Sequence, residues 1–176
     1  KVIIAIGCSN HAAELGAAQM SAELVHYLLT DESPRTRRIL DNVVFLLFPS
    51  MNPDGMDLIV DWYKQTLGKP WEGGQMPWLY NKYVGHDINR DFFMLNQIEN
   101  RHFAKVFYED WHPQVFLTMH QMGNRGPRLF VPPNYEPVDP NYEPLLWREA
   151  GLLGHAMATE LEARDMKGVI TNAMYD

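Results

Sequence analysis

The stretch of sequence that decides the fold is residues 2–14, which read VIIAIGCSNHAAE. Its first five residues form a short, continuous apolar run that ends at Gly7, a pattern typical of a buried strand. From Ala12 to Leu29 the apolar residues recur at steps of three and four, which predicts a helix. Polar side chains lie between the two, so we expect functional groups where the first strand ends.

The rest of the chain continues this alternation of strands and helices. Further strands are predicted at 43–48, 115–119 and 169–170, and further helices at 92–107 and 145–163. Strands that alternate with helices predict an α/β fold with three layers, α/β/α, around a mixed and largely parallel sheet.

Three segments have no clear periodicity. Residues 31–38 read as a polar link in which Pro34 breaks regular structure. Residues 56–83 read as a long ordered loop with short helical turns, and a loop of this length is usually either functional or wrongly assigned. Residues 125–144 are rich in Pro, Asn and Tyr, which predicts irregular structure.

Composition places the chain among globular proteins. Its 176 residues are near the usual size of one domain, and 46% hydrophobic against 21% charged residues is not a disordered balance. The net charge of −7 argues against a nucleic-acid partner, because phosphates favour a basic surface. No apolar run approaches the roughly 18 residues that span a bilayer. The single cysteine, Cys8, excludes an internal disulfide and reads as a small buried residue.

Both ends of the sequence look cut. The chain opens on Lys1, directly before the first apolar run, and it stops at Asp176 without a polar tail. We therefore expect residues 1–176 to form a single, partial domain of a longer protein, incomplete at both ends.

A candidate metal site is formed by residues that follow the first and third predicted strands. His11 and Glu14 are three positions apart at a helix start, so both side chains can point to the same side. His120 ends the third strand, and carboxyl ends of parallel strands meet at one edge of a sheet. Two imidazoles, one carboxylate and a water form a typical catalytic zinc site. An isolated HxxE is common by chance, and Glu14 alone could favour a helix N-terminus, so the prediction depends on all three residues.

A second candidate group is GHDINR at 85–90. Asn89 and Arg90 can clamp a carboxylate together, because a guanidinium group offers two parallel donors. The alternative is a surface turn in which Arg90 forms an ordinary ion pair with Asp87 or Asp91.

The order of these motifs resembles the zinc carboxypeptidase family. HxxE at 11–14, NPDG at 52–55, DxNR at 87–90 and the strand-final His120 follow the order of that family, over about residues 1–125. The resemblance implies a mixed sheet between helices and a hydrolase that acts on the C-terminus of a peptide or protein. It also implies that NPDG is a turn shaping the floor of the pocket.

The resemblance also implies roles for particular residues. The implied ligands of one Zn²⁺ ion are His11, Glu14 and His120, and the implied ligands of the substrate carboxylate are Asn89 and Arg90. The family's arginine that polarises the scissile carbonyl is absent from its place after NPDG. The sequence there reads DWYK at 61–64. Lys64, Arg125 or Arg128 could replace it.

The general base is left unassigned by this resemblance. In the family it is a glutamate on a late strand, beyond the part that this sequence covers, and the glutamates of the last predicted helix read as a solvated face. We therefore expect the chain alone to bind zinc weakly at best and not to turn over peptide. Enzymes of this kind are often exported, which favours an extracytoplasmic or secreted location.

Three functions are consistent with the sequence. The leading interpretation is a zinc-dependent metallocarboxypeptidase that cleaves a C-terminal peptide bond with a metal-activated water. An aspartoacylase-like zinc deacylase of N-acyl amino acids shares the HxxE, the Asn-Arg pair and the third histidine, but NPDG and the aromatic loop favour a peptide substrate. A non-catalytic zinc- and peptide-binding module is the third. The sequence predicts neither the preferred terminal residue nor the oligomeric state.

Overall fold

The computed structural model describes residues 1–123, 125–135 and 139–173. The chain divides into two compact units, Lys1–Gln121 and Met122–Asp176, and each is described by itself. Among the described helices, none combines the length and the apolar character that a membrane crossing requires.

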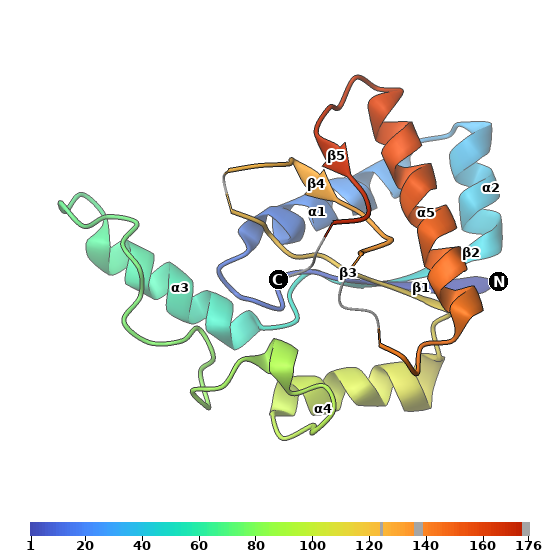
Figure 1. The fold of residues 1–176 in the computed structure, drawn as a ribbon. Helices are drawn as coiled ribbons and strands as arrows, with labels where there is room; N and C mark the ends of the chain where they lie inside the picture. The colour runs from blue at the N-terminus through green and yellow to red at the C-terminus, as the bar shows by residue number, and fades with distance from the viewer. Residues whose placement is uncertain (124, 136–138, 174–176) are drawn as a thin grey trace. The chain divides into compact units, whose positions relative to one another are not determined.

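A three-stranded parallel sheet organises the first unit (Figure 1). The central strand β1 (Val2–Gly7) lies between β2 (Val43–Phe48) and β3 (Val115–Thr118), and Ile4 pairs with both Phe45 and Val115. The three apolar runs thus form the expected strands, and their parallel order confirms the predicted α/β class. Because all three strands run in the same direction, their carboxyl ends meet at one edge.

Helices cover this sheet, with α1 and α4 on opposite sides of it (Figure 1). The helical elements of the first unit are α1 (Leu15–Thr30), α2 (Pro34–Asn42), α3 (Pro53–Thr66), a 3₁₀ turn (Ile88–Arg90), α4 (Ile98–Lys105) and a π-helical segment (Val106–Trp111). The core between sheet and α4 is aromatic. Phe103 and Phe107 are buried beside Ala5, and their stacked rings lie 4.0 Å apart between centroids. This packing fixes α4 against the sheet.

Two of these helices differ from the sequence prediction. Residues 34–38 of the expected polar link belong to α2, and residues 56–66 of the expected loop belong to α3. In both cases a proline stands at the first helical turn, where its missing N–H costs nothing. The residue before each proline caps the helix: Ser33 Oγ accepts from Thr36 N, and Asn52 Oδ1 accepts from Gly55 N.

The helix predicted at 92–107 begins later than expected. Residues 92–97 are not helical, because the buried carboxylate of Asp91 accepts the backbone N–H groups of Asn96 and Gln97 at 3.1 and 2.9 Å. Leu95 has a positive φ of 53°, which also interrupts a right-handed helix. The helix α4 therefore starts at Ile98.

The second unit contains two short parallel strands and a long helix. β4 (Leu129–Phe130) pairs with β5 (Val169–Ile170), and α5 (Pro144–Glu162) lies between them in the sequence. The strand at 169–170 and the last helix were predicted, whereas β4 falls in a segment expected to be irregular. Gly154 of α5 approaches the backbone of Pro132 so closely that a Cβ atom would collide with it. Parts of the segment 125–144, residues 136–138, lie outside the described residues.

Candidate metal centre

The loop after β1 is held in place by backbone hydrogen bonds to both neighbouring strand ends. Met51 N donates to Cys8 O, and Met119 N donates to Gly7 O, both at 2.9 Å. Cys8 is fully buried, as expected from its position. Ser9 has a positive φ of 49°, and its hydroxyl donates to Glu14 O at 2.8 Å. These contacts close the loop over residues 9–14 and set the direction of its side chains.

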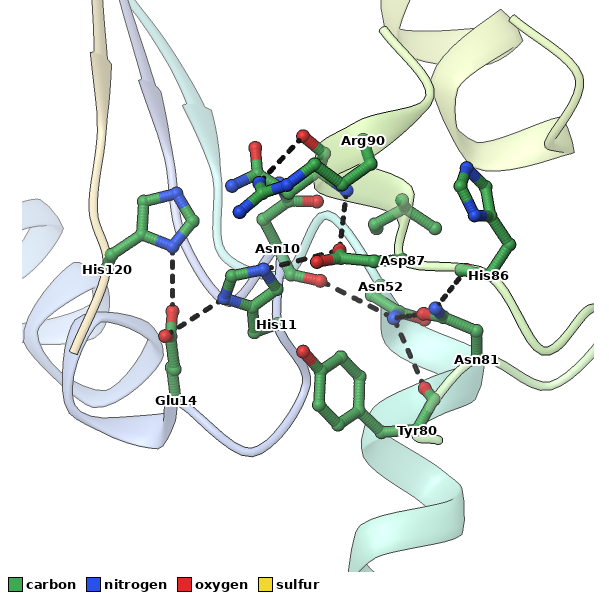
Figure 2. Close-up of polar contacts among 12 residues, drawn as sticks. Asn10, His11, Glu14, Asn52, Tyr80, Asn81, His86, Asp87, Arg90 and His120 are labelled. Carbon is green, nitrogen blue, oxygen red and sulfur yellow. Dashed lines mark hydrogen bonds and ion pairs between the residues drawn. The ribbon is translucent and has the colours of Figure 1, made fainter. Parts of the chain in front are cut away.

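Three predicted residues come together at this edge of the sheet (Figure 2). Glu14 lies between the two histidines: its Oε1 is 3.0 Å from His11 Nδ1, and its Oε2 is 3.0 Å from His120 Nδ1. The imidazole rings of His11 and His120 are 4.8 Å apart between centroids. Each of the three side chains is only 17–18% exposed.

Glu14 stands at the N-cap of α1, but its side chain makes no capping hydrogen bond. Its carboxylate contacts the two histidines instead, so helix capping does not explain this residue. Burial by itself would raise the pKa of Glu14, but the hydrogen bonds to His11 and His120 outweigh it and lower the pKa to about 2. The hydrogen bond to Glu14 also shifts the pKa of His11. It raises this pKa, although burial alone would lower it.

The donor set of this cluster fits a zinc ion. One ligand atom from each of His11, Glu14 and His120 lies within 4.8 Å of the others, so the three could hold a metal ion. Two imidazole nitrogens and one carboxylate oxygen are the protein ligands of a class of catalytic zinc sites. The cluster is partly exposed, so solvent or a substrate can reach it.

Asp87 also lies at the cluster, although the sequence suggested for it only a place in the DxNR motif and an ion pair with Arg90. Its Oδ1 lies 3.3 Å from His11 Nε2, the ring nitrogen that faces away from Glu14. The same oxygen accepts the backbone N–H of Asn89 at 2.8 Å. Metal-binding histidines usually direct their second nitrogen to such a carboxylate, which fixes the ring. The DxNR motif, which begins with this aspartate, was the only signal in the sequence for its place at the site.

Asn89 and Arg90 lie on the 3₁₀ turn that follows Asp87. The contact of Asp87 with His11 connects this turn to the cluster. Arg90 is exposed, and its Nη1 donates to Asn89 O at 3.3 Å. It forms no ion pair within the described part of the chain, so the ordinary ion pair with Asp87 or Asp91 is absent there. The guanidinium group is therefore available to a ligand.

Tyr80 is a second residue that the sequence did not indicate. Its ring lies 5.7 Å from that of His11 between centroids. Burial, together with the negative charges of Asp87 and Glu14, raises the pKa of Tyr80 to about 12. The phenol is therefore protonated at neutral pH.

NPDG is the start of α3 rather than an isolated turn, and it positions Tyr80. Asn52 Nδ2 donates to Tyr80 O at 3.3 Å and to Asn81 Oδ1 at 2.8 Å. Gly55 leaves room for the Tyr80 carbonyl, which a Cβ atom at that position would meet. The motif therefore supports Tyr80 and Asn81, next to the cluster of His11, Glu14 and His120, and contributes no residue to that cluster.

Three residues were candidates to replace the family's missing arginine, and they lie in different parts of the structure. Lys64 is exposed in the last turn of α3. Arg125 and Arg128 belong to the second unit. Their roles stay predictions.

Comparison with known families adds an independent finding. A family model described as zinc carboxypeptidase matches residues 1–123. The match covers more than half of the chain and includes all three residues of the cluster, as well as Asn89 and Arg90. No protein in the curated collections matches the chain.

Proposed function

The chain belongs to the zinc carboxypeptidase family, and we propose that it acts as a zinc-dependent carboxypeptidase that removes the last residue of a peptide or protein. Membership makes it a metallopeptidase-type hydrolase in general. The observation that carries the finer proposal is the convergence of His11, Glu14 and His120 within the segment that the family model matches.

We propose that these three side chains hold one zinc ion. Bound zinc would supply a water of lowered pKa and would polarise a carbonyl group. Glu14 contributes a carboxylate that is ionised throughout the neutral range, because its pKa is about 2. Asp87 acts as a positioning residue: its contact with His11 Nε2 holds the ring so that Nδ1 faces the cluster.

Asn89 and Arg90 would select the end of the substrate. A peptide C-terminus carries a carboxylate, and the planar guanidinium group can donate two parallel hydrogen bonds to it. The exposure of Arg90 and its lack of an ion pair in the described residues support this role. We assign no general base and no oxyanion-stabilising cation.

The test uses two peptides of one sequence, incubated with the full-length, zinc-loaded protein. One peptide has a free C-terminal carboxylate and the other a C-terminal amide. Mass spectrometry should show loss of the last residue from the free peptide only, and removal of zinc with a chelator should abolish the loss. Readdition of zinc should restore it.

Other outcomes would contradict the proposal in defined ways. Hydrolysis of an N-acetyl amino acid with no cleavage of either peptide indicates a deacylase. Stoichiometric zinc and measurable peptide binding without any hydrolysis indicate a non-catalytic binding module. Internal cleavage of both peptides overturns the proposed selection of a C-terminus.

A further inference from the structure

A pocket of about 560 Å³ lies between α3 and the segment that follows it. Its walls include the aromatic rings of Trp62, Trp78 and Tyr80 and the side chains of Ile59 and Met76. None of the residues that line it carries a charge, although the chain as a whole has a net charge of −7. An uncharged, aromatic pocket favours an apolar occupant, because burial of an unpaired charge is costly.

Specific contacts hold the walls of this pocket. Trp62 Nε1 donates to Gly74 O at 2.9 Å, which joins α3 to the following segment. Glu72 fixes the same segment, because its carboxylate accepts from Tyr63 Oη at 2.9 Å and from Gly68 N at 2.7 Å. The rings of Trp62 and Trp78 meet edge to face, 5.9 Å apart between centroids. These contacts fix part of the pocket wall in place.

The pocket borders the candidate metal centre. Ala13 lines it and stands between the two cluster residues His11 and Glu14 in the sequence. Tyr80 lines it as well, and its ring lies 5.7 Å from the ring of His11. Figure 2 shows Tyr80 and Arg90 on opposite sides of His11. A peptide whose C-terminus is held at Arg90 therefore has Tyr80, a wall of the pocket, on the far side of His11 (Figure 2).

We propose that this pocket binds an apolar side chain, best an aromatic one, of a substrate residue on the N-terminal side of the scissile bond. This direction rests on the proposed function, in which the terminal carboxylate is held by Asn89 and Arg90. The part of the peptide upstream of the metal then passes Ala13 and Tyr80. The pocket selects against charged upstream residues, since its lining offers them no counter-charge.

The substrate test uses N-acetylated tetrapeptides that share one C-terminal residue, with the full-length, zinc-loaded protein. The penultimate residue, and in a second series the residue before it, is Phe, Gly or Asp. We expect one series to show kcat/KM higher for Phe than for Gly by roughly tenfold or more, with Asp lowest, because a buried aromatic ring is removed from water. Cleavage that is indifferent to both positions overturns the inference and leaves the proposed function standing.

Two variants alter the pocket in opposite ways. Trp78→Ala removes a wall and Ile59→Trp fills the space, so both should abolish most of the preference for Phe while cleavage of the Gly peptide continues. Trp71→Ala is the matched control, because Trp71 and Trp78 are both 57% exposed but Trp71 does not line the pocket. Equal preferences in Trp71→Ala and Trp78→Ala would contradict the assignment. Thermal unfolding of each variant shows whether it is folded. If Trp78→Ala does not fold, Ile59→Trp still tests the assignment of the pocket.

A binding measurement separates this inference from the activity. Saturation-transfer NMR with N-acetylphenylalaninamide, which has no carboxylate, needs neither zinc nor turnover. We expect ring-proton transfer with the wild type and with Trp71→Ala, and its loss with Ile59→Trp. If no peptide is cleaved, this signal still supports the apolar site and its absence overturns it. Concentration-dependent dimerisation that Ile59→Trp abolishes would instead identify a second copy of the chain as the occupant and overturn the substrate role.

Discussion

Glu14 and His120 are 106 positions apart in the chain, yet Glu14 Oε2 lies 3.0 Å from His120 Nδ1. Glu14 follows β1 and His120 follows β3, and these strands are hydrogen-bonded neighbours that run in the same direction. The pairing of the strands therefore brings the third residue of the cluster to the HxxE pair. The cluster is a consequence of the sheet topology and not of the local motif alone.

His120 should be necessary for zinc binding, because it supplies one of two imidazole donors. The full-length wild type should bind one zinc ion per chain. His120→Ala should weaken binding by more than the roughly 10- to 100-fold that loss of an outer-shell partner causes. Inductively coupled plasma mass spectrometry and a chelator competition measure this. His26→Ala, at an exposed position of α1, should bind zinc like the wild type. Stoichiometric zinc in His120→Ala would remove this residue from the ligand set.

The metal-free protein should lose stability in acid through Glu14. Its folded-state pKa of about 2 lies below the ordinary value of 4.5, so its contribution is fully present above pH 4.5 and is lost as pH falls towards 2. The contribution is of the order of a few kcal/mol. Urea unfolding of the wild type and Glu14→Gln should show a difference in the free energy of unfolding that shrinks from about pH 5 to about pH 3. Glu23→Gln, exposed on the same helix, should follow the wild type. A difference that is constant with pH would contradict this assignment.

The strands could be predicted from the sequence because a parallel strand covered on both faces appears as a continuous apolar run. The helix α2 was missed because Pro34 was interpreted as a break. The helix α3 was missed because NPDG was interpreted as a turn and residues 56–83 as a long loop. Each proline occupies the first turn of a helix and follows a capping residue, Ser33 or Asn52. A side-chain cap followed by proline was the signal for both helices.

The candidate site was predictable where it depends on local spacing or on strand ends. His11, Glu14 and His120 satisfy those conditions. Asp87 and Tyr80 reach the cluster through a long segment without periodicity, whose course depends on contacts such as that of Asn52 with the Tyr80 carbonyl. Spacing along the chain carries no information about such contacts, so their approach to His11 appears only in three dimensions.

Asp87 should affect zinc affinity without binding zinc itself. Asp87→Ala removes both the acceptor that faces His11 Nε2 and the acceptor of Asn89 N, and should weaken zinc binding by roughly 10- to 100-fold. Asp87→Asn keeps an oxygen acceptor but loses the charge, so it should fall between Asp87→Ala and the wild type. The same chelator competition measures all three, and Asp61→Asn, at an exposed position of α3, is the control. Wild-type affinity in Asp87→Ala would show that the 3.3 Å contact does not orient His11.

Arg90 should act on substrate binding and not on the metal. Arg90→Ala should raise KM for a peptide with a free C-terminus by roughly tenfold to hundredfold, since a hydrogen bond to a charged group contributes about 1.5–3 kcal/mol. Arg90→Lys should recover part of this loss, because an ammonium group is a point charge without the planar fork of guanidinium. Zinc content should stay unchanged in both variants.

The decisive comparison for Arg90 is between substrates rather than between rates. Steady-state kinetics should show that Arg90→Ala removes the preference for a free carboxylate over an amide at the same C-terminus. Arg101→Ala, exposed on α4, should keep this preference. A KM that rises equally for the free and the amidated peptide would mean that Arg90 contacts some other part of the substrate, and the carboxylate would then need a different cation.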